Sequence, residues 1–376
     1  MGSIRLFTIR GIPVRMHITF PLILVWAAFQ FGSSQGNWLR GAAFGIVFTL
    51  LLFLCVVLHE LAHSLVALQF GSRVHEITLL PLGGVAQMEQ IPEKPFQELA
   101  LSLAGPLTSG VIGVGLAVLT VLLFPLRIWG DFVRALGSGG TLRWAYLMPY
   151  LAVTNLFLAL FNLLPAFPMD GGRVLRALLA TVMPYGRATV IAIRVGQALA
   201  WMVGLAGLLT RDVFLILVAL FVYAGATQEG HMVQLKTALA GLRVRQVYSH
   251  PVQPVRTDDP LSYVVDLMLS GFQTDFPVCD GERLVGMLTR SDVLRGLKER
   301  GPNIAIAEVM QRNFFTVQPE DDLFDVQQRM SEQRLEAVPV VEGSTFLGLL
   351  TRQDLEEAYR LVLAYPALLP RRSGGG

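Results

Sequence analysis

Charged residues are scarce in this chain of 376 residues: only 15% are Asp, Glu, Lys or Arg, whereas 53% are hydrophobic. Soluble domains average about 25% charged residues, so a chain that is soluble throughout is excluded. The formal net charge is only +2, which is too small to indicate a nucleic acid or an acidic partner. The composition predicts an integral membrane protein that carries some soluble mass.

Cysteine is scarce as well. The two cysteines, Cys55 and Cys279, lie in segments of opposite character, so we do not expect them to form a disulfide. This usage is compatible with a reducing compartment around the soluble part of the chain.

A signal-peptide cleavage site is missing near the N-terminus. The apolar segment 17–31 follows Arg5, Arg10 and Arg15, but no pattern of small residues comes after it. Because a secretory signal peptide requires such a site, we interpret this segment as the first membrane span.

Long apolar segments recur through the first 235 residues. A transmembrane helix needs about 20 apolar residues, and six segments meet or approach this length. The first is short and the second is long, which favours tilt or a partly re-entrant start. The predicted spans are residues 16–31, 41–70, 98–124, 144–165, 188–210 and 213–231.

Lysine and arginine in the short loops indicate the orientation, because cytoplasmic loops carry an excess of them. If the N-terminus is cytoplasmic, nine lysines and arginines lie in the inside loops and five in the outside loops. This orientation predicts that the soluble C-terminal part is cytoplasmic too. The inside set is Arg5, Arg10, Arg15, Arg73, Lys94, Arg173, Arg176, Arg187 and Lys236; the outside set is Arg40, Arg127, Arg134, Arg143 and Arg211.

Two histidines interrupt the second apolar segment, in the sequence His59-Glu60-Leu61-Ala62-His63. Histidines four residues apart on a helix lie on one face, so both imidazoles can bind one Zn²⁺. Glu60 follows the first histidine and can act as general base on an activated water. Ionisable groups at membrane depth mark a functional site. The alternative is a chance motif whose histidines are satisfied by interhelical hydrogen bonds.

A catalytic zinc site needs a third protein ligand and an open fourth position. Asp170 is the obvious donor, because Pro165 and Pro168 end the fourth predicted span and leave Asp170 on irregular backbone at the membrane boundary. Such backbone is tolerated only inside protein or beside a cavity. The alternatives are a turn aspartate before two glycines, and Cys55, one turn before His59, as the third ligand.

Segment 74–90 lies between the second and third predicted spans. Its β-branched residues and its central Gly83-Gly84 predict a strand, a turn and a second strand. An unpaired strand edge beside the metal could hold an extended substrate by β-augmentation. The alternative is a structural turn whose glycines only supply unusual dihedral angles.

An internal repeat begins after about residue 242, where the composition becomes that of a globular domain. At an offset of 62 residues, the heptapeptide that begins at Gly286 matches the one that begins at Gly348. Each copy predicts a short strand, a helix, two strands and a second helix. One copy buries too little surface alone, so we expect the two to pack as a pseudo-symmetric pair. The predicted domains are 1–235 in the membrane, repeats at 243–303 and 304–365, and a flexible tail at 366–376.

The sequence HELAH in a membrane span, followed about a hundred residues later by NLLPAFPMDGGR, resembles the site-2 protease family of intramembrane zinc metalloproteases. The repeat resembles a tandem of CBS domains, and together these likenesses cover essentially the whole chain. They imply a polytopic α-helical membrane domain followed by a soluble α/β CBS module.

The protease resemblance implies the roles of individual residues. It implies one Zn²⁺ per chain with His59, His63 and Asp170 as ligands and Glu60 as catalytic base. Asn162 would be a polar group of the site that stabilises the tetrahedral intermediate. The family's substrate-contacting loop corresponds to Gly83, Gly84 and Val85.

The CBS resemblance implies an adenine nucleotide, AMP, ADP or ATP, in the cleft between the two copies. Its ribose and phosphate contacts would be Thr289, Asp292, Thr351 and Asp354. The alternative is that each Thr-x-x-Asp sequence only caps a helix. CBS pairs often associate, so a homodimer is one expectation.

The predicted function is regulated intramembrane proteolysis by a zinc metalloendopeptidase of a prokaryotic plasma membrane. Its substrates would be membrane-anchored proteins within the lipid bilayer, with no nucleic acid partner and with modulation by adenine nucleotide. One alternative is a CBS-regulated transporter or channel, which internal symmetry among the spans would favour. Another is an inactive protease homologue acting as a scaffold, which loss of Glu60 or a ligand would favour.

Overall fold

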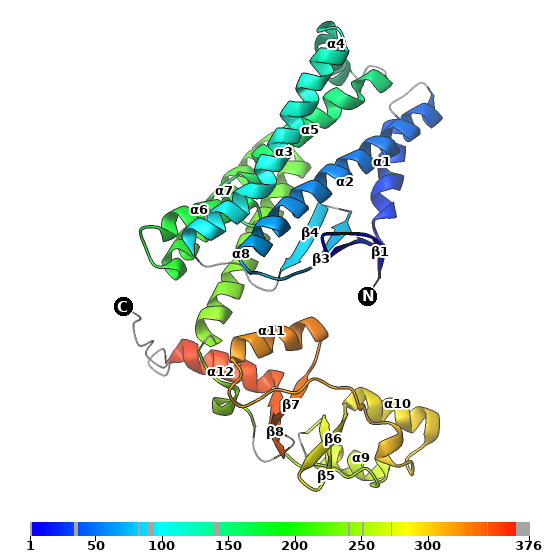
Figure 1. Cartoon of the computed structure of the whole chain (residues 1–376), viewed down its shortest axis with the longest axis vertical. Coiled ribbons are helices and arrows are strands. Elements are labelled where there is room, and N and C mark those ends of the chain that lie inside the picture. Colours follow the sequence, from blue (N-terminus) through cyan, green and yellow to red (C-terminus); the bar gives the residue numbers. More distant parts are fainter. Residues whose placement is uncertain are drawn as a thin grey trace. The chain divides into compact units, whose positions relative to one another are not determined.

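The computed structural model describes residues 2–33, 37–81, 83–88, 94–138, 143–239, 241–249, 252–271, 273–343 and 345–365. The segment 366–376, expected to be a flexible tail, lies outside these residues. The chain divides into two compact units, Met1–His231 and Met232–Gly376, whose elements are labelled in Figure 1.

A four-stranded sheet belongs to the first unit. Its strands β1 (Ser3–Ile9), β2 (Ile12–His17), β3 (Val74–Leu80) and β4 (Gly83–Met88) lie in that order. Both residues of the β1–β2 turn, Arg10 and Gly11, have positive φ angles of 48° and 86°, as tight hairpin turns require. Strand β3 pairs parallel with β2 and antiparallel with β4. This order leaves β4 at an edge of the sheet.

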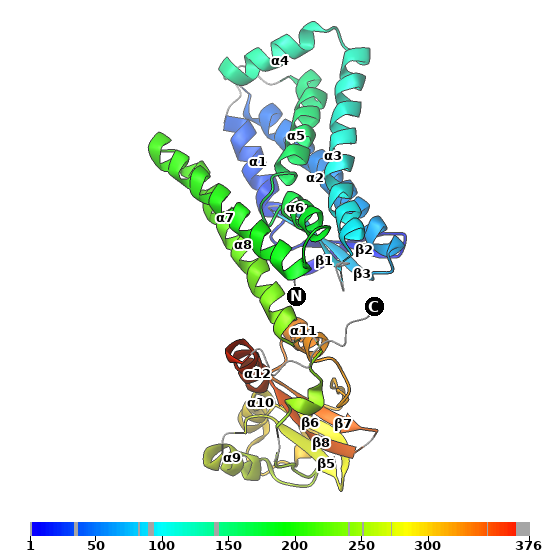
Figure 2. The same cartoon turned by 90° about the vertical axis from the view of Figure 1, so that its left-hand side faces the viewer.

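Eight helices complete the described part of the first unit, and the last of them continues into the second. They are α1 (Pro21–Ser33), α2 (Trp38–Gln69), α3 (Pro95–Leu123), α4 (Arg127–Ser138), α5 (Leu147–Asn162), α6 (Asp170–Ala180), α7 (Tyr185–Thr210) and α8 (Val213–Leu239). A short 3₁₀ turn, Trp144–Tyr146, leads into α5. Helices α7 and α8 run antiparallel as a hairpin (Figure 2), with Gly207 lying against Ile216 near its closed end.

Five of the helices are long and apolar enough to cross a membrane: Trp38–Gln69, Pro95–Leu123, Trp144–Asn162, Tyr185–Thr210 and Val213–Leu235. The prediction for the first span is wrong at its start, because Met16 and His17 belong to strand β2. Apolar and polar residues alternate before position 17, which is the period of a strand rather than a helix. Helix α1 itself has only 13 residues and packs against α2.

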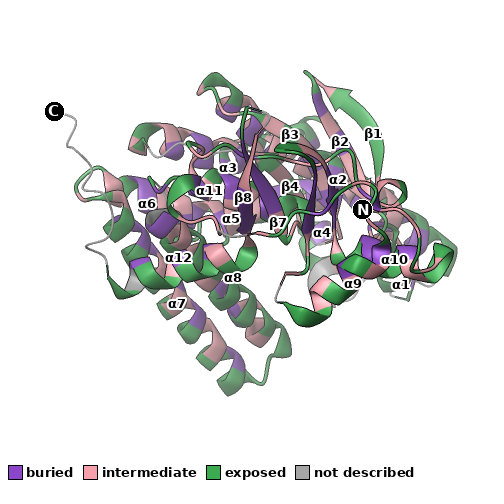
Figure 3. Ribbon diagram, turned by 90° about the horizontal axis from the view of Figure 1, so that it is seen from below, coloured by how far each residue is buried: buried purple, intermediate pink, exposed green. Residues whose placement is uncertain are grey.

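The second unit contains the two copies of the repeat. The first comprises α9 (Leu261–Ser270), β5 (Phe276–Asp280), β6 (Arg283–Leu288) and α10 (Arg290–Arg300); the second comprises α11 (Leu323–Gln333), β7 (Ala337–Glu342), β8 (Thr345–Thr351) and α12 (Arg352–Ala364). The strand order β5-β6-β8-β7 places the two hairpins side by side. Most residues of β7 and β8 are buried or half-buried (Figure 3).

The first strand expected in each copy is reduced to a single bridge. Val255 pairs with Val278 and Val317 pairs with Val340, again at an offset of 62 residues. The helix, the two strands and the second helix occur as the repeat predicts.

The N-terminal segments of the two copies are exchanged between them. Leu242 and Val244, where the first copy begins, lie in the core of the second. Ile306 and Met310, near the start of the second copy, lie in the core of the first. Because each copy completes the other's core, the two fold as one unit. Leu239, the last residue of α8, also lies in the core of the second copy.

Both cysteines are buried and free, as their positions in the sequence predict. Burial in the second unit raises the pKa of the Cys279 thiol to about 11, so this thiol is neutral at physiological pH and unreactive.

Candidate metal centre

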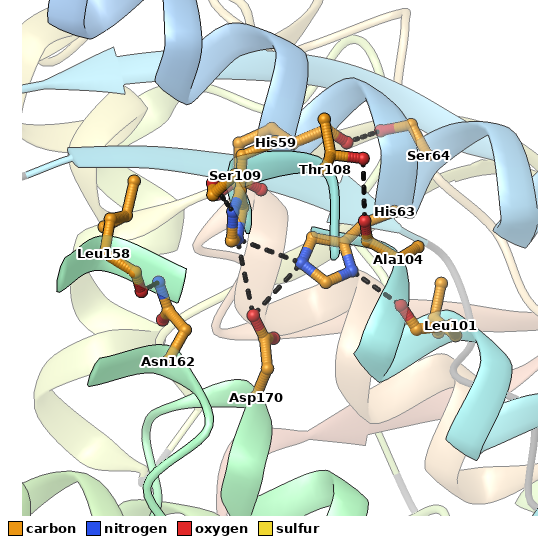
Figure 4. A network of polar contacts seen from close by, with 11 residues as sticks. His59, His63, Ser64, Leu101, Ala104, Thr108, Ser109, Leu158, Asn162 and Asp170 are labelled. Atoms are coloured by element: carbon orange, nitrogen blue, oxygen red, sulfur yellow. Dashed lines mark hydrogen bonds and ion pairs between the residues drawn. The ribbon is translucent and has the colours of Figure 1, made fainter. Parts of the chain in front are cut away.

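Three side chains from two distant segments converge within the first unit. His59 and His63 lie one turn apart on α2 and are only 5% and 6% exposed. Asp170 is the first residue of α6. The His63 Nε2 atom lies 3.2 Å from His59 Nε2 and 3.1 Å from Asp170 Oδ2, and His59 Nε2 lies 3.4 Å from Asp170 Oδ2 (Figure 4).

These distances can be tested against the geometry of a zinc site. Ligand atoms about 2.0–2.1 Å from a tetrahedral Zn²⁺ lie about 3.3 Å from one another. The three observed separations lie between 3.1 and 3.4 Å. Among the described residues, this is the one group of three His, Cys, Asp or Glu side chains suited to hold a metal. The residues present therefore fit a zinc ion with three protein ligands.

Helix α6 places Asp170 opposite the two histidines. Helix α5 ends at Asn162, and α6 begins at Asp170, so the expectation that Asp170 stands on irregular backbone is wrong. An aspartate in the first turn of a helix is favoured by the free N–H groups there. A Cβ on Gly171 would overlap the Leu164 carbonyl, so this glycine lets α6 start directly against the preceding loop.

Helix α3 supplies hydrogen-bond partners for both imidazoles. The His63 Nδ1 atom lies 2.7 Å from the Leu101 carbonyl oxygen. Because a carbonyl can only accept, Nδ1 carries the proton and Nε2 presents its lone pair to the other ligand atoms. The His59 Nδ1 atom lies 2.9 Å from the Ser109 hydroxyl. Such partners fix ring orientation and ligand basicity in metal sites.

Gly105, also on α3, lies directly over the ligand atoms. A Cβ at this position would lie 2.5 Å from His59 Nε2 and closer still to His63 Nε2. The space that any other side chain would fill is therefore open beside both metal-facing nitrogens. Sequence reasoning missed Gly105, Leu101 and Ser109; the available signal was a Gly-Pro pair inside an apolar helix, since Pro106 follows Gly105 within α3.

Glu60 faces the edge strand β4. A Cβ on Gly84 would lie 2.7 Å from Glu60 Cγ, so the absence of a side chain at Gly84 lets β4 approach α2 at this residue. The backbone of Ala86 on β4 also lies near the Glu60 carboxylate. Gly83 has a φ of +147°, which favours glycine, and Val85 is 48% exposed.

Asn162 and Cys55 occupy other positions around the ligands. The Asn162 amide donates to the Leu158 carbonyl at 3.0 Å and lies on the same side of the ligands as Asp170 (Figure 4). Cys55 is buried on α2 but does not belong to the group of three ligands. The geometry therefore favours Asp170 over Cys55 as the third ligand.

The four residues expected to contact a nucleotide lie at helix starts in the second unit. Thr289 and Asp292 form a capping box on α10, and Thr351 and Asp354 form the corresponding box on α12. Residues from the exchanged segments reach both aspartates: the Gln311 amide donates to Asp292 Oδ2 at 2.8 Å, and the Ser249 hydroxyl donates to Asp354 Oδ1 at 2.6 Å. Arg295 also pairs with Asp292.

Comparison with known proteins bears on both units. Peptidase family M50 matches residues 47–203, and the CBS domain matches residues 244–299 and 306–361. A zinc metalloprotease of Methanocaldococcus jannaschii is 36% identical over 361 residues, covering 96% of this chain and 97% of that protein.

Two solved structures are also similar to parts of the chain. The site-2 protease of the same archaeon is 43% identical, with 61% of this chain and 95% of that chain covered and a TM-score of 0.44. The CBS domains of a transcriptional regulator from Streptococcus pneumoniae are 31% identical, covering 31% of this chain and 98% of that chain, with a TM-score of 0.29.

A methyl group at Gly105 should weaken metal binding. In Gly105→Ala the new Cβ would overlap both Nε2 atoms, so the imidazoles or α3 must shift, and we expect zinc affinity to fall at least about ten-fold. Zinc per chain after dialysis of the detergent-purified protein measures this. Gly115→Ala on the same helix is the matched control, because a Cβ there meets nothing within 4 Å. Wild-type zinc content in Gly105→Ala would contradict the position of the site.

Proposed function

Because this chain belongs to peptidase family M50, the site-2 protease family, we propose that it hydrolyses membrane-spanning proteins within or at the edge of the bilayer. It is a multi-pass zinc metalloprotease with paired CBS domains. The observation that carries the assignment of residues is the convergence of His59, His63 and Asp170 with separations that match zinc coordination.

Each residue of the proposed site has a distinct task. His59, His63 and Asp170 hold Zn²⁺, which when bound activates a water and polarises the scissile carbonyl. The Glu60 carboxylate takes a proton from the attacking water and returns it to the leaving amine. Gly105 leaves room beside the ligand nitrogens for the reacting groups. The Asn162 amide stabilises charge on the carbonyl oxygen after releasing its bond to Leu158.

Strand β4 is the proposed docking site for the substrate. A helix in lipid has all its amides hydrogen-bonded, so a substrate must unwind locally before its backbone can be attacked. An edge strand can pair with the unwound segment by β-augmentation. The support is that β4 is an edge strand, that Gly83, Gly84 and Val85 begin it, and that Gly84 lies against Glu60.

The CBS pair is proposed to bind an adenine nucleotide and to modulate proteolysis. CBS domains commonly bind such ligands, and Thr289, Asp292, Thr351 and Asp354 offer hydroxyl and carboxylate groups that can bond to ribose hydroxyls. Helix α8 provides a physical connection, because it contains an apolar span and ends in the core of the second copy.

The cellular arrangement follows from the loop charges. We propose a prokaryotic plasma membrane with the N-terminus and the CBS domains in the cytoplasm, since Lys and Arg in the segments assigned to that side outnumber those on the other side even without the buried Arg176. We also propose that two chains associate through their CBS domains. The formal net charge of +2 gives no support for binding nucleic acid.

Removing the proton acceptor should separate metal binding from catalysis. Glu60 is not among the three proposed ligands, so Glu60→Gln should keep wild-type zinc while cleavage falls by at least about 100-fold. The measurement is cleavage of a tagged single-span membrane protein co-expressed with each variant, together with zinc content. Glu76→Gln on β3 is the control and should cleave normally. Retained cleavage in Glu60→Gln would remove its role as general base.

The two aspartates proposed to contact the nucleotide should not contribute equally to its affinity. Asp292 is only 1% exposed and pairs with both Arg295 and Gln311, whereas Asp354 is half-buried and bonded by the smaller Ser249. Asp354→Asn keeps a carbonyl oxygen for capping but loses the charge, and we expect AMP affinity of the full chain to fall about ten-fold. Asp292→Asn should have a smaller effect. If calorimetry shows equal AMP affinity in wild type and Asp354→Asn, Asp354 does not contact the nucleotide and only caps α12.

A further inference from the structure

A buried arginine lies on the same helix as the proposed third metal ligand. Arg176 is on α6, six residues after Asp170 and therefore about 9 Å further along the helix. Its side chain is only 2% exposed. The Nε atom donates to Glu98 Oε1 at 2.7 Å, and the NH1 group donates to Glu229 Oε1 at 2.5 Å. One guanidinium thus connects α6 to α3 and to α8.

Two aromatic rings enclose the same guanidinium. Its central carbon lies 5.1 Å from the centre of the Phe167 ring and 5.0 Å from that of Tyr185. Phe167 belongs to the loop that leads into Asp170, and Tyr185 is the first residue of α7. Two carboxylates and two aromatic rings, each from a different segment, therefore contact the planar guanidinium. Lysine cannot reproduce this geometry.

Stability alone is a weak reason for such a cluster. Desolvation of buried charges often cancels their attraction, and apolar replacements of similar volume are frequently no less stable. Here the Arg176 guanidinium pairs with two carboxylates, and Glu98 Oε2 has no hydrogen-bond partner among the described residues. A buried oxygen without a partner is costly, so the cluster calls for a role beyond stability.

Two of the three helices that Arg176 connects, α3 and α6, contribute to the metal centre. Helix α3 carries Glu98, and three residues later Leu101, whose carbonyl orients His63. Helix α6 carries Asp170. The spacing between these two helices sets how far Asp170 Oδ2 lies from the imidazole nitrogens, so a shift of α6 would separate the ligands.

We infer that Arg176 is a positioning residue, which through Glu98 and Glu229 holds Asp170 at coordinating distance from His59 and His63. The inference rests on the proposed metal site. Glu229 lies on α8, so the contact that fixes α6 also depends on the placement of that helix.

Cobalt binding tests this role. The full-length protein in detergent is stripped of metal and titrated with Co²⁺, whose d–d absorption reports ligand number and geometry. Arg176→Met should weaken Co²⁺ binding about ten-fold or more and change the shape of the spectrum. Arg176→Lys should restore part of the affinity. Arg187→Met removes an exposed arginine of α7 and should match wild type in both measurements.

Thermal unfolding of the same samples separates positioning from stability. A lowered melting temperature in Arg176→Met with wild-type Co²⁺ affinity and spectrum would overturn the inference. If Arg176→Met does not fold, Glu229→Gln tests the inference instead. It removes only one contact of Arg176, at a side chain that is 24% exposed and therefore less costly to change. We expect a several-fold loss of Co²⁺ affinity there, and unchanged binding would overturn the inference. Wild-type binding that survives in His59→Ala would instead contradict the metal site itself.

Discussion

The approach of one carboxylate to two imidazoles inside an apolar helix bundle is the interaction on which the rest of the structure depends. Buried polar groups in such surroundings are unfavourable unless each has a partner. Here three helices supply the partners: α2 carries the histidines, α3 carries the hydrogen-bond partners of both Nδ1 atoms, and α6 carries Asp170. The absence of a side chain at Gly105 keeps the remaining space open.

The same constraint accounts for the breaks in the helices. Helix α5 stops at Asn162, and α6 starts eight residues later with the carboxylate at its first position. A continuous span would carry this segment through the bilayer without bringing Asp170 back to α2. Ala166, Phe167 and Met169 of the interruption are buried, and the Arg176 cluster connects the short helix to its neighbours.

Most of the metal centre could be predicted from the sequence because its signals are local. The four-residue spacing of His59 and His63 fixes their shared helix face, and Asp170 follows a proline-rich interruption of an apolar segment. The CBS pair could be predicted because equal offsets along the chain reveal a repeat directly. The hairpin before α3 was predicted from its glycines and β-branched residues.

Other features could not be predicted, because they depend on contacts between distant segments. Gly105 is marked only by the Gly-Pro pair that it forms with Pro106, and Ser109 carries no pattern of its own until α3 is placed beside α2. Arg176 was interpreted as a loop charge that reports orientation, whereas it is buried between three helices. The first span was predicted from hydropathy alone, which cannot detect the pairing of β2 with β3. The exchange between the two CBS copies likewise depends on tertiary structure.

The zinc content of the detergent-purified full-length protein tests the central claim most directly. The account predicts one zinc per chain in the wild type, loss of zinc in both His59→Ala and Asp170→Ala, and no change in Cys55→Ala, since Cys55 lies outside the group of ligands. Wild-type zinc in a folded Asp170→Ala protein, or no zinc in the folded wild type, would contradict it.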